Sequence, residues 1–127
     1  MKIQLTSVLV DDQEKALRFY TEVLGFVKKT DIPAGEFRWL TVISPEGAEG
    51  VELVLEPNAF QAAQDYQKAI FYQGIPATSF ASSDIHKESQ KLKDRGVVFR
   101  MEPTQAGPTT IAVFEDTCGN LIQLHQA

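Results

Sequence analysis

The chain repeats one order of expected elements, and this internal repeat limits the possible folds more than any single motif does. Each half is predicted to contain one strand, one helix and then three strands joined by short turns. A shift of about 71 residues superimposes Gly25, Val42, Glu52 and Leu53 on Gly96, Val113, Gln123 and Leu124. A shift of one residue more superimposes Leu5 on Ala77 and Asp12 on Asp84. A unit that buries one sheet face against its helix leaves the other face free, so the repeat predicts two such faces.

The first half begins with a strand and an amphipathic helix. Residues 3–10 are apolar and rich in β-branched side chains, which predicts a strand. Asp12 is suited to cap the helix that follows, in which apolar residues recur at helical spacing until Gly25 ends it. The three strands expected after this helix cover residues 26–30, 37–44 and 51–55, with turns at residues 32–35 and 45–47.

The second half follows the same order after a connecting helix at residues 59–73. We expect a strand at 77–81, a helix from the Ser83-Asp84 cap through Arg95, strands at 97–101, 110–115 and 121–125, and a turn at 104–108. A ferredoxin-like β-α-β-β-α-β fold is the main alternative, but it has only two strands between its helices. Because three strands follow each helix here, the repeated β-α-β-β-β module is favoured.

Composition and charge narrow the cellular setting and the partners. The 127 residues carry a net charge of −5 with basic and acidic side chains intermixed, which disfavours binding to nucleic acid or to an anionic membrane. There is no apolar run long enough for a transmembrane helix, and residues 1–10 lack the layout of a cleavable signal. The single cysteine, Cys118, cannot form an intrachain disulfide and suits a reducing compartment. We therefore expect a cytoplasmic protein.

Four stretches resemble, in order, the motifs of one family. The first runs from Val10 to Phe26, with an acid before the helix and a Phe-Tyr-x-x-x-Leu-Gly-Phe ending. The others are Val51-Glu52-Leu53, Asp84-Ile85 and the closing Phe114-x-Asp116-x-x-Gly119-Asn120-x-Ile122-x-Leu124. Together they span nearly the whole chain, which thus resembles the vicinal oxygen chelate superfamily, also called the glyoxalase/bleomycin resistance protein/extradiol dioxygenase family.

The resemblance implies an α+β fold with two tandem β-α-β-β-β modules, which form a curved mixed sheet around a small-molecule pocket with the helices on the outer face. The chain would be a single domain, with module one at about 1–57, a connecting helix at about 58–74 and module two at about 75–127. In this family the modules pair within one chain or across a dimer. A homodimer is the expectation that the resemblance implies.

Metal-dependent members of the family take four ligands from the first and last strands of the two modules. Carried over to this chain, these positions are Leu5, Glu52, Ala77 and Gln123. A stable divalent-cation site usually has at least three oxygen or nitrogen donors, and Leu5 and Ala77 offer none. Glu52 and Gln123 remain as the only candidate metal ligands, so we expect no cofactor and disfavour a metal site. A register error of one residue would bring Gln4 to the same face.

Glu52 is the candidate catalytic residue. It alternates with Leu53 and should face the concave side of the sheet, where a carboxylate is costly unless it is paired or its pKa is raised. One interpretation is a general base or acid. The other, weighted equally, is a carboxylate in a wet groove or paired with an arginine.

The predicted ligand-binding residues are mostly apolar. Phe37 and Trp39 alternate on one strand and suit the lining of a pocket, although core or dimer packing would also explain Trp39. Phe99 and Met101 alternate on the matching strand of the second half and are weaker candidates. His125 follows Gln123 at the period of a strand, and is either a ligand-binding residue or a partly exposed residue near the chain end. The predicted set is completed by Leu5, Ala77 and Gln123.

Two further residues are assigned no role. His86 lies among charged residues of the second predicted helix, which indicates a solvated side chain. Cys118 has no neighbouring His or Lys that would lower its pKa, so it is not predicted to be a nucleophile.

Three functions are consistent with this pattern. The first is a metal-free protein, similar to the bleomycin resistance branch, that binds an aromatic or amphipathic compound. The second is a lyase or isomerase of the glyoxalase type that uses Glu52, with or without a weakly held divalent metal. The third is a regulatory or assembly role in which the pocket is a remnant. Because the chain has only two histidines, a dioxygenase with a histidine-based iron site is disfavoured.

Overall fold

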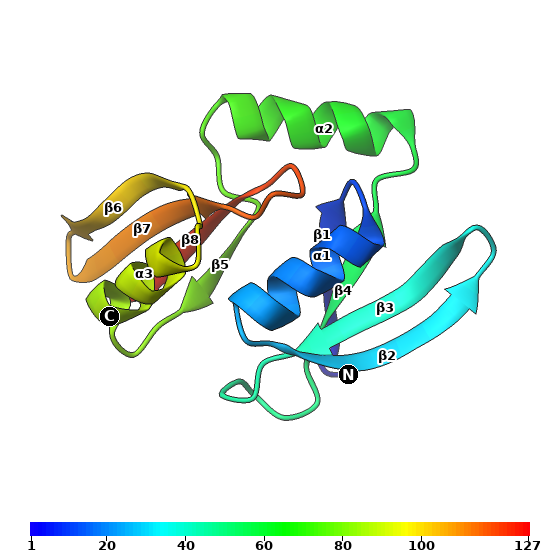
Figure 1. The fold of residues 1–127 in the computed structure, drawn as a ribbon, viewed down its shortest axis with the longest axis horizontal. Coiled ribbons are helices and arrows are strands. Elements are labelled where there is room, and N and C mark those ends of the chain that lie inside the picture. Colours follow the sequence, from blue (N-terminus) through cyan, green and yellow to red (C-terminus); the bar gives the residue numbers. More distant parts are fainter. The chain divides into compact units, whose positions relative to one another are not determined.

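The computed structural model describes residues 1–127 and contains helices and strands in the predicted order (Figure 1). The first half contains β1 (Leu5–Val10), α1 (Gln13–Arg18), its π-helical continuation η1 (Phe19–Val23), β2 (Val27–Ala34), β3 (Phe37–Ile43) and β4 (Glu52–Pro57). Helix α2 (Gln61–Tyr72) follows. The second half contains β5 (Thr78–Ala81), α3 (Ile85–Asp94), β6 (Phe99–Ala106), β7 (Thr109–Glu115) and β8 (Leu121–Gln126). None of the helices combines the length and the apolar character needed to cross a bilayer.

The chain divides into two compact units, residues 1–64 and 65–127, with the boundary inside α2. Each unit contains one four-stranded mixed sheet, with strand orders β1-β4-β3-β2 and β5-β8-β7-β6. The first strand of each unit pairs in parallel with the last, and all other pairs are antiparallel. The repeated β-α-β-β-β module is therefore confirmed and the ferredoxin-like alternative excluded. The strands form two sheets of four rather than one sheet of eight.

The helices α1 and α3 begin in the same way. The Asp12 carboxylate accepts the backbone N–H of Lys15 at 3.0 Å, and the Asp84 carboxylate accepts that of Lys87 at 3.1 Å. Each cap satisfies a backbone donor that has no partner within its own helix. Both predicted caps are thus confirmed. The first helix continues as η1 and ends before Gly25, whose φ of +86° favours glycine.

The β2–β3 and β6–β7 hairpins are longer than the sequence pattern predicted. Pro33 and Pro103 lie inside β2 and β6, which are the edge strands of their sheets. An edge strand tolerates proline because the missing N–H can face away from the ladder. The turns predicted at residues 32–35 and 104–108 are therefore wrong in extent. The actual turns are two residues long and begin with Gly35 and Gly107, each at a φ of +63° that suits glycine at the first position of a type II′ turn.

One face of each sheet packs against the helix of the same unit. In the first unit the buried residues of this interface are Val8, Val10, Leu40, Val42 and Leu55 from the sheet, with Ala16 and Tyr20 from α1 and η1. In the second unit they are Ala112, Phe114, Ile122 and Leu124, with Ile85 and Leu92 from α3. Because strand residues alternate between faces, the intervening residues lie on the opposite face of each sheet.

The observed register corrects the alignment of the two halves in one strand. Val42 pairs with Leu53, whereas Val113 pairs with Gln123 rather than with Leu124. Val42 therefore lies on the face that packs against its helix, and Val113 lies on the opposite face of its sheet. The sequence alignment is one residue out here because it contains no information on how neighbouring strands pair.

Gln13 occupies a gap between β3 and β4. These two strands are paired over only two residues each. Beyond that point the Gln13 Nε2 donates to the carbonyl oxygens of Arg38 at 2.7 Å and Leu55 at 2.9 Å, and its Oε1 accepts the backbone N–H of Arg38 at 3.0 Å. The buried side-chain amide thus satisfies backbone groups that would otherwise lack partners, and it fastens α1 to the β2–β3 hairpin.

We predict that Gln13→Leu destabilises the protein by about 2–4 kcal/mol, because three backbone groups lose their partners at once. Urea unfolding at neutral pH measures this change. The control is Gln73→Leu at an exposed position after α2, which should change the free energy of unfolding by less than about 0.5 kcal/mol. Equal effects of the two substitutions would contradict the bridging role of Gln13.

Candidate functional site

Each sheet has a face opposite its helix, and these two faces hold most of the predicted site residues. In the first unit we call this surface the Glu52 face. Pairing and strand alternation assign to it Leu5, Ile32, Phe37, Trp39, Thr41, Glu52 and Val54. In the second unit we call it the Gln123 face, and its residues are Ser79, Ala81, Met101, Ile111, Val113, Gln123 and His125.

Glu52 is held in place by a threonine that the sequence pattern did not single out. The Thr41 hydroxyl donates to Glu52 Oε1 at 2.7 Å and accepts the backbone N–H of Thr30 at 3.1 Å. Thr41 is fully buried, and the β2–β3 register shifts by one residue between Lys28 and Thr30, beside this contact. The Glu52 carboxylate therefore has a fixed hydrogen-bond donor and a defined position. In the sequence, the two-residue spacing of Thr41 from Trp39 was the pattern that could have assigned Thr41 to this face.

The Glu52 face is rich in exposed apolar side chains. Leu5 is 47% exposed, Ile32 55%, Phe37 41% and Trp39 39%. Leu5 lies beside Glu52 in the parallel β1–β4 ladder, and Trp39 lies beside Ile32 on the hairpin. The structure therefore places Leu5, Phe37 and Trp39 on the same face as Glu52. Their roles in binding stay predictions.

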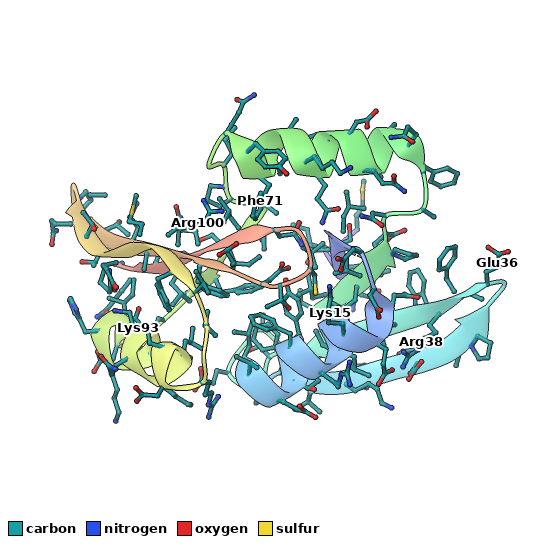
Figure 2. The ribbon with its side chains drawn as sticks, turned by 45° about the horizontal axis from the view of Figure 1, so that its top comes forward. Lys15, Glu36, Arg38, Phe71, Lys93 and Arg100 are labelled. Atoms are coloured by element: carbon teal, nitrogen blue, oxygen red, sulfur yellow. The ribbon has the colours of Figure 1, made fainter.

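The other face of the β2–β3 hairpin carries an ion-pair cluster around Arg38 (Figure 2). Arg38 Nε and Nη2 donate to the two carboxylate oxygens of Asp31 at 3.0 and 2.7 Å, and Nη1 contacts Glu14 of α1 at 2.6 Å. The hydrogen bonds from Arg38 lower the pKa of Asp31 below its usual range, and the two acids raise the pKa of Arg38. The cluster joins both strands of the hairpin to α1 and so supports the strand that carries Phe37 and Trp39.

Three polar side chains form a chain of hydrogen bonds on the Gln123 face. Gln123 Nε2 donates to Ser79 Oγ at 3.1 Å, and Ser79 Oγ lies 2.7 Å from His125 Nδ1. Ser79 is exposed, and Gln123 and His125 are partly buried. Gln123 and His125 lie on one face, as their spacing predicted. Ser79 was assigned no role from the sequence, because the register of β5 against β8 was unknown.

Two predicted residues occupy different places from those expected. Ser79, rather than Ala77, pairs with Gln123 as Leu5 pairs with Glu52, and Ala77 precedes β5. Phe99 and Met101 do not share a face, because the β6–β7 register shifts between them. Phe99 packs on the buried Phe114 with its ring 5.4 Å from the Lys93 ammonium of α3, whereas Met101 lies on the Gln123 face.

The residues at the family's metal positions do not form a full ligand set. Leu5 has no donor atom, and Glu52 is the one carboxylate beside it in the ladder. Gln123 and Ser79 are neutral and are hydrogen-bonded to each other. No group of three or more His, Cys, Asp and Glu side chains is arranged to hold a metal ion. The donors present are thus a poor match for a divalent cation, which favours several charged or imidazole ligands.

His86 and Cys118, to which the sequence assigned no role, are not among the residues of the Gln123 face. His86 is exposed on α3. Cys118 is fully buried in the β7–β8 turn, and its carbonyl oxygen accepts a hydrogen bond from Gln67 of α2 at 3.0 Å. The same Gln67 amide donates to Asn120 at 3.1 Å. This turn is therefore a buried structural connection between α2 and the second sheet.

Comparison with known proteins agrees with the fold. The model of the Glyoxalase/Bleomycin resistance protein/Dioxygenase superfamily matches residues 2–124. The chain belongs to this superfamily. The resemblance inferred from the motifs of the sequence is thus confirmed over nearly the whole chain.

Three relatives are similar to this protein over nearly its whole length. The YurT protein of Bacillus subtilis strain 168 is 59% identical over 126 residues, which cover 99% of each chain. A probable lactoylglutathione lyase of Synechocystis is 32% identical and covers 95% of this chain and 92% of its own. Among solved structures, TnmS3, an antibiotic binding protein from Streptomyces sp. CB03234, is 33% identical with a TM-score of 0.78, over 99% of this chain and 95% of that one.

We predict that Asp31→Asn destabilises the protein by about 1 kcal/mol at pH 7, because Arg38 loses its bidentate ion pair with the carboxylate. A carboxylate whose pKa is lowered on folding stabilises the protein above its unfolded pKa of about 3.9, and this contribution is lost as the pH falls through the folded value. The difference between wild type and variant should therefore shrink as the pH falls below about 3.9.

Urea unfolding from pH 7 to pH 2.5 tests this expectation. Asp11→Asn is the control, since it removes an exposed ion pair with Lys15 and should have a smaller effect. A wild-type advantage over Asp31→Asn that was as large at pH 2.5 as at pH 7 would contradict the assignment.

Proposed function

We propose that this protein binds a small aromatic or amphipathic organic molecule on the faces of its sheets that lie opposite the helices. The observation that supports this most directly is the group of exposed apolar side chains around Trp39 on the Glu52 face. Ligand sites are lined mainly by aromatic and apolar groups with a few fixed polar ones. The Glu52 face has this composition, with Glu52 as its fixed polar group.

Glu52 is suited to orient such a ligand. Its Oε1 accepts the Thr41 hydroxyl, and Oε2 has no hydrogen-bond partner within the chain. An acceptor next to exposed aromatic rings favours a molecule with a hydroxyl or amino group attached to an apolar framework. TnmS3, with its antibiotic-binding role, supports this class of function within the superfamily.

We further propose that binding takes place without a metal ion. The support comes from the donor chemistry, because Leu5 replaces a ligand by a hydrocarbon and Ser79 and Gln123 are neutral and bonded to each other. Binding would then depend on apolar contact area and on directed hydrogen bonds. The protein is proposed to be cytoplasmic, given its single buried thiol, and homodimeric, given the apolar area that the Glu52 face exposes.

A lyase or isomerase activity is the second candidate. The similarity to a probable lactoylglutathione lyase of Synechocystis favours it. In this case Glu52, with its position set by Thr41, would move a proton as general base or acid. The binding function is preferred because no second acid or base lies beside Glu52 in the sheet.

We predict that Trp39→Ala weakens binding of N-phenyl-1-naphthylamine, an uncharged aromatic probe, by about tenfold. The loss follows from the removal of the largest exposed ring on the Glu52 face. The increase in probe fluorescence on titration with protein measures it.

Phe60→Ala is the matched control. Phe60 is an aromatic residue of the same unit that is 79% exposed and precedes α2 rather than lying in a sheet. Its loss should leave the affinity unchanged. Equal weakening by both variants, or no binding to the wild type, would contradict the proposed site.

We predict that protein purified without metal-affinity steps contains less than about 0.1 equivalent of any transition metal, because its donor set is incomplete. Elemental analysis measures this. If the chain forms lactoylglutathione, Glu52→Gln should abolish turnover, whereas Glu56→Gln, an exposed glutamate of the same strand, should not. A stoichiometric metal ion, or turnover that depends on Glu52, would favour the enzyme over the binding protein.

A further inference from the structure

The hydrogen bonds that link Gln123, Ser79 and His125 can be assigned donors and acceptors from the chemistry of their atoms. A primary amide nitrogen can only donate, so Gln123 Nε2 donates its hydrogen to Ser79 Oγ at 3.1 Å. The serine hydroxyl has a single proton of its own. The one acceptor in the chain within hydrogen-bond distance of it is His125 Nδ1, at 2.7 Å.

The direction of these hydrogen bonds favours one tautomer of the histidine. If Ser79 donates to Nδ1, the neutral imidazole carries its proton on Nε2. The reverse arrangement, with Nδ1–H donating to Ser79, would leave the serine proton without an acceptor in the chain. The hydrogen bonds of Gln123 and Ser79 thus favour the His125 tautomer that donates through Nε2. His125 Nε2 makes no hydrogen bond within the chain.

We infer that His125 Nε2–H is the hydrogen-bond donor for an acceptor oxygen, of the carbonyl, carboxylate or sulfonate class, in a molecule bound on the Gln123 face. This inference rests on the proposed binding function and assigns a chemical feature to the ligand. Ile111 pairs with His125, and Val113 and the exposed Met101 continue the same face, so apolar contacts adjoin the donor. A fixed donor beside apolar side chains recognises an oxygen attached to an apolar framework.

The two sheets thus offer opposite hydrogen-bonding character on their last strands. The last strand of the first unit carries the Glu52 carboxylate, which only accepts when ionised. The last strand of the second unit carries His125, which donates through Nε2. When His125 is in this tautomer, the side chains of Gln123, Ser79 and His125 are uncharged, so an anionic acceptor meets no like charge from them. An acceptor oxygen is therefore selected by the Gln123 face and not by the Glu52 face.

A matched pair of fluorescent probes tests this assignment. 8-Anilinonaphthalene-1-sulfonate and N-phenyl-1-naphthylamine share one aromatic framework, and only the first has acceptor oxygens. His125→Phe removes the donor and should weaken binding of the sulfonate about tenfold while binding of the amine is unchanged. His125→Gln, whose Nε2 can donate from a similar distance, should restore most of the sulfonate affinity. His86→Phe, on α3, should change neither affinity.

Nitrogen-15 spectra of the imidazole rings show which ring nitrogen carries the proton. A variant that only alters stability would not change this. The chain has two histidines, so His86 is an internal reference for His125. The neutral form of His125 should show a protonated Nε2 and an unprotonated Nδ1, and Ser79→Ala should introduce the other tautomer. Thermal unfolding of each variant verifies that it is folded.

The outcomes separate the two claims. Failure of both probes to bind the wild type would overturn the proposed function and this inference with it. Binding of both probes, with His125→Phe weakening neither or both equally, would overturn the inference alone. A His125 that carries its proton on Nδ1 in the wild type would also overturn it.

Discussion

Each four-stranded sheet of this protein has a single helix to cover it, and the rest of the structure depends on that imbalance. Burying apolar side chains against α1 or α3 stabilises only one face of each sheet. Strand residues alternate, so the other face presents every second residue of the same strands. The faces that hold Glu52 and Gln123 are thus a direct consequence of the β-α-β-β-β module.

The exposed aromatic residues of the first unit need support from the opposite side of their hairpin. β3 is paired with β4 over only part of its length, and Gln13 bridges the gap with three hydrogen bonds to backbone groups. Arg38 adds the ion pairs to Asp31 and Glu14. These polar contacts hold the strand that carries Trp39 without covering its ring. A buried amide at this point stabilises the hairpin because each backbone group it contacts would be costly to leave unpaired.

The two modules share a fold and differ in the chemistry of their exposed faces. In the first, a buried threonine fixes a carboxylate beside apolar side chains. In the second, an amide and a hydroxyl fix the orientation of an imidazole. At the positions where the superfamily places metal ligands, Glu52 is hydrogen-bonded to Thr41, and Gln123 is hydrogen-bonded to Ser79. That arrangement suits directed hydrogen bonds to an organic ligand better than the coordination of a cation.

Much of the fold could be predicted from local patterns. The capping residues Asp12 and Asp84, the order of the strands and the shared face of Phe37 and Trp39 follow from spacing and alternation alone. The hairpin lengths could not be predicted. A proline interrupts a strand in the interior of a sheet but is tolerated in an edge strand, and the sequence does not show that the strand of Pro33 lies at the edge. The shared face predicted for Phe99 and Met101 failed because a bulge lies between them.

The sequence by itself determined the repeated module and the absence of a donor atom at Leu5, because periodicity and residue type are local properties. Only the tertiary structure decided that Thr41 holds Glu52 and that Ser79, rather than Ala77, joins Gln123 to His125. Those contacts depend on the register between strands that are distant in the chain. A shift of register by one residue turns every side chain to the other face, and no local pattern records which register the completed sheet adopts.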